Sequence, residues 1–123
     1  MNEELRAEHF ERITDEKARH VYDWLCDACD RRPGGITDPD QMLVCDVAFA
    51  EQIKGGLMDD VAKRGVGMER YNGRQKYWAE NKSLAQYRAF ADLQRKHLAE
   101  LRLTPGGRKA AIQDIGDEFD AFE

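Results

Sequence analysis

Residues 38–64 carry apolar side chains on two stripes at helical spacing, and this segment constrains the fold more than any other. The first stripe consists of Met42, Cys45, Phe49 and Ile53, and the second consists of Leu43, Val47, Ala50, Leu57 and Val61. A helix with so broad an apolar surface must be covered on more than one side. The sequence therefore predicts a central helix, buried within the chain or in an oligomer.

Inside this segment Gly55 and Gly56 are adjacent. Each weakens a helix by roughly 1 kcal/mol relative to alanine. We expect a kink or a close helix crossing to explain the pair.

Two helical patterns precede the central segment. The pattern over 3–13 is weak. The pattern over 15–32 is stronger, and Thr14 is its expected N-cap. Its expected buried stripe consists of Val21, Trp24, Leu25, Ala28 and Cys29. Pro33, Gly34 and Gly35 end this helix.

A hairpin signal and further helical patterns follow. Asn72-Gly73 between aromatic-containing runs predicts a β-hairpin over 67–78, because both turn positions need positive φ. Asn81 or Ser83 then caps a long helix that ends near Leu101, and a short helix is expected over 105–113. The predicted fold is mainly α: a helical hairpin, one small β-hairpin and a long C-terminal helix, assembling as an oligomer. Residues 1–113 form one domain, and residues 114–123 form an acidic, flexible tail.

The charges fall into three blocks. Residues 1–60 carry 7 Lys/Arg and 15 Asp/Glu. Residues 61–109 carry 12 Lys/Arg and 4 Asp/Glu, and residues 110–123 carry no Lys/Arg and 5 Asp/Glu. A basic block of this kind can recruit a polyanion such as DNA. Alternatively, the blocks neutralise one another within a chain or between subunits.

The sequence lacks a signal peptide and an apolar run long enough to span a membrane, which predicts a cytoplasmic protein with reduced thiols. Cys26 and Cys29 have a zinc-ligand spacing, and Cys45 is a possible third ligand, but a second close pair is missing. We interpret all three as core thiols, with a metal or redox pair as the alternatives. His9, His20 and His97 suggest no catalytic or metal arrangement, and no ATP-binding loop is present, so no cofactor is expected.

The basic residues of the middle and C-terminal part are the candidate DNA-binding set. They are Lys63, Arg64, Arg70, Arg74, Lys76, Lys82, Arg88, Arg95, Lys96, Arg102, Arg108 and Lys109. Arg88, Arg95 and Arg102 recur every seven residues, which places them on one flank of a helix. Tyr71, Tyr77 and Trp78 interleave with the basic residues of the hairpin. Tyr77 and Trp78 are expected to pin the hairpin to the helices, although a hairpin tip that binds DNA is also compatible with the pattern.

This order of elements, over roughly residues 15–110, resembles the phage terminase small subunits of tailed double-stranded DNA phages (the P-twenty-seven-type family). The most specific match is the Leu-Thr-Pro-x-x-Arg motif, here Leu103, Thr104, Pro105 and Arg108. Arg102 stands where the family often has glycine, so we expect a less sharply terminated helix before the motif. The acidic N-terminal region shows no clear helix-turn-helix.

The resemblance implies a non-catalytic subunit that forms a homo-oligomeric ring in the host cytoplasm. Such a subunit binds viral double-stranded DNA and delivers it to the large subunit, which holds the ATPase and nuclease. Met42, Phe49, Ile53 and Leu57 would then form the oligomer interface. Phe119 and Phe122 of the tail would anchor on the large subunit. The alternatives are a phage-derived DNA-binding transcription regulator, a small metalloprotein or enzyme built on the cysteines, and a structural adaptor.

Overall fold

The computed structural model describes residues 1–104 of the 123-residue chain. Four helices and one two-stranded antiparallel sheet follow in the order α1 (Glu3–Arg12), α2 (Glu16–Asp30), α3 (Asp38–Arg64), β1 (Gly67–Asn72), β2 (Gln75–Glu80) and α4 (Lys82–Glu100). This confirms the predicted mainly α fold with one small β-hairpin. The helix expected over 105–113, Arg108, Lys109 and the tail 114–123 with Phe119 and Phe122 lie outside the described residues.

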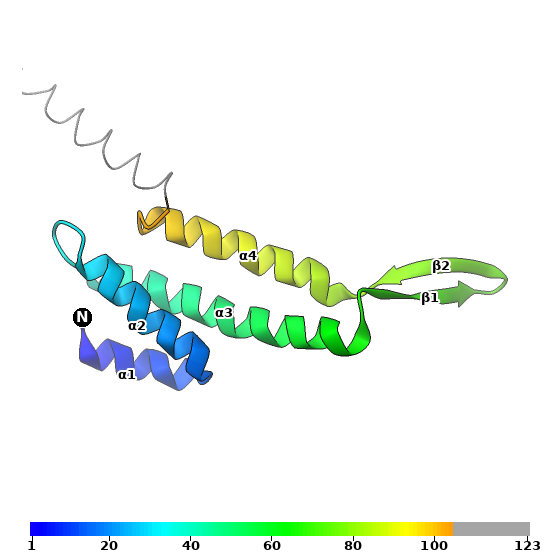
Figure 1. Cartoon of the computed structure of the whole chain (residues 1–123), viewed down its shortest axis with the longest axis horizontal. Helices are drawn as coiled ribbons and strands as arrows, with labels where there is room; N and C mark the ends of the chain where they lie inside the picture. The colour runs from blue at the N-terminus through cyan, green and yellow to red at the C-terminus, as the bar shows by residue number, and fades with distance from the viewer. Residues whose placement is uncertain (105–123) are drawn as a thin grey trace, which may run out of the picture.

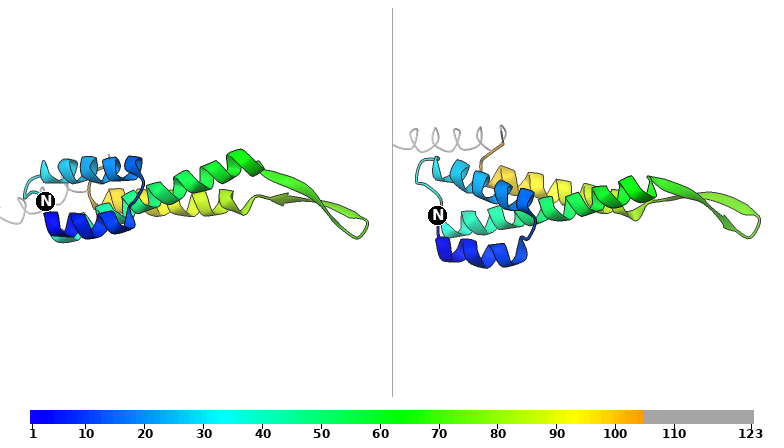
Figure 2. Two further views of the ribbon diagram at one scale, coloured as in Figure 1. Left: turned by 90° about the horizontal axis from the view of Figure 1, so that it is seen from below. Right: turned by 60° about the horizontal axis from the view of Figure 1, so that its bottom comes forward.

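The four helices form a body from which the hairpin projects (Figure 1). α3 is the central element, because α1, α2 and α4 all pack against it. α1 and α2 cover its N-terminal half, and α4 runs back along its length (Figures 1 and 2). The hairpin leaves at the far end of α3 and α4, pointing away from α1 and α2. The prediction of a central helix is therefore confirmed within a single chain.

The helix starts follow from capping side chains. Asn2 accepts a hydrogen bond from the Leu5 amide, and Asp15, not Thr14, accepts one from the Ala18 amide. Thr37 and Asp40 form a reciprocal capping box at the start of α3. Asn81 caps α4 by accepting from the Ser83 amide.

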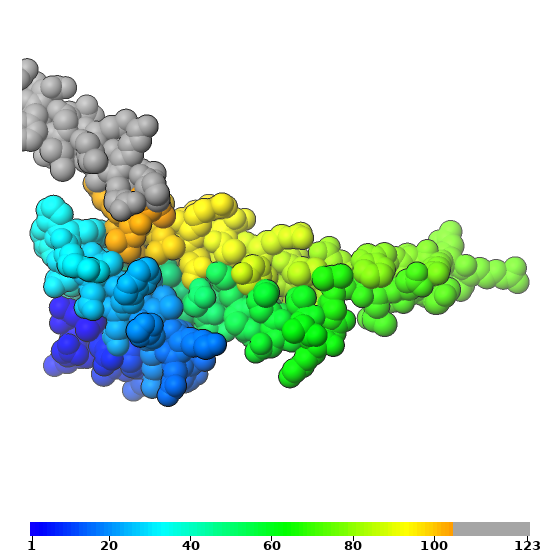
Figure 3. All heavy atoms as spheres, in the orientation of Figure 1, coloured from blue at the N-terminus to red at the C-terminus, as the bar shows by residue number. Residues whose placement is uncertain are grey.

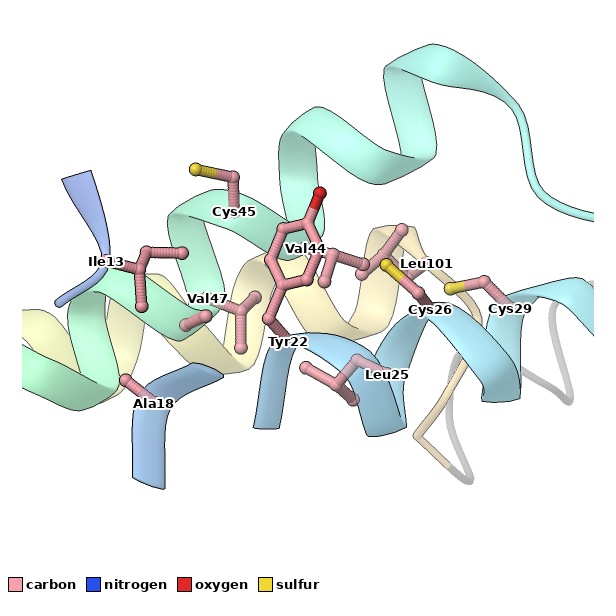
Figure 4. Close-up of a cluster of buried hydrophobic side chains, with 11 residues drawn as sticks. Ile13, Ala18, Tyr22, Leu25, Cys26, Cys29, Val44, Cys45, Val47 and Leu101 are labelled. Atoms are coloured by element: carbon pink, nitrogen blue, oxygen red, sulfur yellow. The ribbon is translucent and has the colours of Figure 1, made fainter. Parts of the chain in front are cut away.

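The core lies where α1, α2, α3 and the end of α4 meet (Figure 4). Its large fully buried side chains include Tyr22 and Ile13, and Leu101 reaches it from the end of α4. The expected stripe of α2 was partly wrong. Trp24 is 61% exposed, whereas Tyr22 and Cys26 are buried.

α3 is helical throughout, including Gly55 and Gly56. A Cβ at either glycine would meet no atom within 4 Å. The expected close helix crossing is therefore absent at this pair within the described part of the chain.

The end of α4 corrects a further expectation. Leu101 is the C-cap, and Arg102 has φ of 60°. The Arg102 amide donates to the Ala99 carbonyl at 2.9 Å, and the Leu103 amide donates to the Leu98 carbonyl at 3.1 Å. These two bonds are the Schellman pattern that ends helices sharply, usually with glycine in the left-handed position. Here an arginine adopts that conformation, and the helix is terminated sharply without glycine.

Candidate nucleic-acid interface

The hairpin arm, residues 67–80, exposes nearly all of its side chains (Figure 3). Its register pairs Glu69 with Trp78 and Arg70 with Tyr77. Residues that lie opposite each other share a face of the sheet. One face therefore carries Tyr71, Trp78 and the ion pair between Lys76 and Glu69, and the other carries Arg70 and Tyr77, together with Met68 and Ala79.

The aromatic side chains of the arm do not pin it to the helices, so that expectation was wrong. Tyr71 is 68% exposed, Trp78 60% and Tyr77 48%. The indole of Trp78 instead lies beside Gly67, where a Cβ would come within 2.8 Å of the ring. The arm is thus held by its own strand pairing and by the anchor at its base.

That anchor is a set of hydrogen bonds centred on Asp60. Its carboxylate accepts two bonds from the Arg64 guanidinium, at 2.6 and 2.7 Å, and one from the Ser83 hydroxyl at 2.6 Å. The Asn81 amide group donates to Asp60 at 3.2 Å and to the Gly65 carbonyl at 3.0 Å. These hydrogen bonds hold the pKa of Asp60 well below its usual range, with the Arg64 bond as the largest cause. Together they tie the end of α3 to the start of α4 and fix where the arm leaves the body.

A hollow of about 450 Å³ lies at the base of the arm. Its lining residues combine apolar groups with cations: Met68, Tyr77, Ala79, Gly67 and Asn81 with Arg64, Arg70, Lys82 and Glu80. Arg64 is held by Asp60, and Glu80 lies 3.9 Å from Arg88. The lining cations without an acidic partner among the described residues are Arg70 and Lys82.

All ten described members of the basic set are exposed, but they are not equivalent. Four form ion pairs: Arg64 with Asp60, Lys76 with Glu69, Arg88 with Glu80, and Arg95 with Asp92. Across residues 1–104, five have no acidic partner within ion-pair distance: Lys63, Arg70, Arg74, Lys82 and Lys96. Paired arginines can still bind phosphate, yet the unpaired cations are the ones that need no exchange of partners to do so.

The structure brings part of the set together. Arg64, Arg70 and Lys82 line one hollow, and Lys63 is the neighbour of Arg64 at the end of α3. Arg74 lies in the turn of the arm, next to β2. Arg88, Arg95 and Lys96 follow along α4. Arg102 has left the helix, so it does not continue the flank of Arg88 and Arg95 as expected.

The expected interface residues of α3 have different environments. Met42 is 58% exposed, and Ile53 and Leu57 are half-buried. Phe49 packs against the core of its own chain. Their exposed apolar surface is therefore centred on Met42 and the C-terminal half of α3.

The three cysteines are buried in the core, as predicted, and none forms a disulfide (Figure 4). Burial raises the pKa of Cys26 to about 12 and also raises the pKa of Cys29 and Cys45. Such thiols stay protonated and are poor nucleophiles or ligands. Within residues 1–104, no three His, Cys, Asp or Glu side chains are grouped so that they could hold a metal ion.

Sequence reasoning missed Asp60 and Ser83 as the residues that set the position of the arm. The spacing of Asp60 and Arg64 permits a helical ion pair, which is a weak signal. The bond from Ser83 joins residues 23 apart and leaves no local pattern in the sequence.

The chain matches no protein-family model, no curated protein and no solved structure. In the described residues, every helix is too short or too polar to cross a membrane.

Proposed function

We propose that this chain is a non-catalytic DNA-binding assembly subunit, of the kind that the resemblance to phage terminase small subunits implies. In this role it binds viral double-stranded DNA as a homo-oligomeric ring in the host cytoplasm. It then delivers the DNA to a large subunit that performs ATP hydrolysis and cleavage. The proposal assigns no reaction and no cofactor to this chain.

The observation that carries the proposal is the projecting hairpin arm. Its turn and base present Arg70, Arg74 and Lys82, which have no acidic partner among the described residues. Exposed aromatic side chains lie between these cations. A narrow two-stranded ribbon with cations fits a nucleic-acid groove, and cations near a shared surface attract phosphates.

The proposed assembly has separate support from the apolar surface. Both tryptophans, Trp24 and Trp78, are about 60% exposed. Tryptophan is on average a highly buried residue, so two exposed ones favour a partner surface. The part of α3 and α4 beyond the core is also only half covered, with Ile53, Leu57 and Tyr87 half-buried.

The test measures the binding of a labelled DNA duplex by fluorescence anisotropy at several salt concentrations. The variant Arg70→Gln with Arg74→Gln removes two unpaired cations of the arm. We expect weaker binding and a salt slope shallower by about 0.9 for each phosphate that the variant no longer neutralises. The matched control, Lys17→Gln with Arg31→Gln, removes the same charge from exposed positions at the two ends of α2 and leaves both quantities unchanged.

Equal reductions in affinity for the two double variants would mean that only net charge matters, and the arm would not be the interface. Absence of duplex binding by the native chain at low salt would support a structural adaptor. Tight binding to one defined site by a dimer would support the transcription regulator instead.

A further inference from the structure

The lining of the hollow at the base of the arm combines apolar and cationic side chains. Met68, Tyr77 and Ala79 are its apolar members, and Arg70 and Lys82 are its unpaired cations. Its volume of about 450 Å³ is within the roughly 300–1,000 Å³ of small-ligand pockets in proteins. A polyanion alone would contact the cations and leave the apolar members exposed to water. The hollow therefore suits a ligand with both an apolar group and flanking carboxylates.

The end of this chain has that chemistry. Residues 114–123 read Asp-Ile-Gly-Asp-Glu-Phe-Asp-Ala-Phe-Glu, with no Lys or Arg and with acids on both sides of Phe119. A phenylalanine ring can contact the Met68 thioether and the Tyr77 ring. Asp117 and Asp120, on either side of Phe119 in the sequence, can then face Arg70 and Lys82.

The chain length allows this contact within one molecule. The described chain ends at Thr104, next to the C-terminal end of α4, and the hollow lies at the N-terminal end of the same helix. The 19 residues of α4 span about 28 Å. Phe119 follows Thr104 by fifteen residue steps, which can span up to about 50 Å when the chain is extended. Attachment to the same chain also gives the tail a high effective concentration at the hollow.

We propose that residues 114–123 bind in the hollow at the base of their own hairpin arm. Phe119 contacts the apolar lining residues, and the flanking carboxylates form ion pairs with Arg70 and Lys82. The tail thereby covers cations that would otherwise be open to a polyanion. This occupancy does not depend on the proposed DNA binding. If both hold, the tail lowers the affinity for DNA until another partner takes it up.

The test places the photo-cross-linker p-benzoylphenylalanine at position 119 of the full-length chain. After irradiation, mass spectrometry locates the adducts. We expect adducts at Met68, Tyr77 or Ala79 within single chains. The variant Arg70→Gln with Lys82→Gln should lower their yield by about fivefold, since it removes two exposed charge contacts.

The control variant Lys17→Gln with Arg31→Gln should leave the yield unchanged. A circular dichroism spectrum equal to that of the native chain shows that each variant is folded. Adducts on α1, on α2 or on residues of α3 before Arg64, adducts found only between two chains, or a yield indifferent to Arg70 and Lys82 would each overturn the proposal. Because the readout contains no DNA, a failure of DNA binding leaves this result interpretable.

Discussion

At the scale of single residues, a buried hydrogen-bond network holds α1 on the rest of the body. Gln41 donates to the Tyr22 hydroxyl at 2.8 Å and to the Asn2 carbonyl at 2.9 Å. The Tyr22 hydroxyl lies 2.7 Å from Nδ1 of His9 and donates to it when the imidazole is neutral. Burial raises the pKa of Tyr22, which therefore remains protonated. The network joins three helices through groups that each have a partner.

The same network makes stability depend on pH. Burial, with the nearby Arg12 charge as the next cause, lowers the pKa of His9 below its usual 6.5. The unfolded chain then binds the proton more readily, so the free energy of unfolding falls as pH decreases below about 6.5. We expect urea unfolding to show lower stability at pH 5.5 than at pH 7.5.

The matched variants are His9→Gln, which keeps an acceptor for Tyr22 but does not titrate, and His20→Gln at an exposed position of α2. His9→Gln should remove most of the dependence between pH 7.5 and 5.5, and His20→Gln should retain it. A native chain equally stable at both pH values would show that His9 is not the responsible group.

At the scale of elements, the glycine pair of α3 lowers the stability of the helix, and no contact among the described residues explains why the pair is there. Gly55 and Gly56 are exposed, lie in unbroken helix and have open space where a side chain would go. The double variant Gly55→Ala with Gly56→Ala should raise the free energy of unfolding by about 2 kcal/mol, roughly 1 for each residue. Urea unfolding at one fixed protein concentration measures this change.

Ala89→Gly, at an exposed position inside α4, is the matched reverse change and should lower stability by about 1 kcal/mol. If the double alanine variant is instead less stable than the native chain, the glycines must be packed against something that a single chain lacks. A neighbouring subunit that approaches α3 closely would then be the explanation.

The sequence was sufficient to predict elements whose signals are local. The helix segments, the presence of the hairpin and the Asn81 cap follow from spacing and capping chemistry within a few residues. The expected Asn72-Gly73 turn was wrong by one residue: Asn72 pairs with Gln75, the turn is Gly73-Arg74, and of these residues only Gly73 has a positive φ. Features decided by contacts between distant residues were predicted less well. Trp24 was expected to be the buried aromatic of α2, but residues two apart on a helix point to nearly opposite sides, and it is Tyr22 that faces the core. The side that is buried is decided by contacts with distant residues such as His9 and Phe10 of α1.

For the candidate site, sequence predicted the basic residues and the hairpin, but not how they are arranged. The expectation that Tyr77 and Trp78 pin the arm assumed that exposed aromatic residues must find partners within the chain. The position of the arm depends on Asp60 and Ser83, whose bond spans 23 residues. The sharp end of α4 at Arg102 was also missed, because it needs a non-glycine residue at positive φ.

At the scale of the whole molecule, the structure divides into a compact end and a sparsely covered end. The core of α1, α2 and the first half of α3 is well buried, while the second half of α3, most of α4 and the arm are not. Charge divides along the sequence, since residues 1–60 are acidic and residues 61–109 are basic. In the proposed ring, contacts between the acidic segment of one copy and the basic segment of the next would be favourable.

We propose that the chain works as one subunit of a larger assembly, and its solution mass distinguishes this from a chain that functions alone. Multi-angle light scattering on the purified full-length chain should show a single sharp species of many times 14.2 kDa. A species of 14.2 kDa at micromolar concentrations would contradict the claim, and the exposed tryptophans and half-covered stretch of α3 and α4 would then belong to a chain that functions alone.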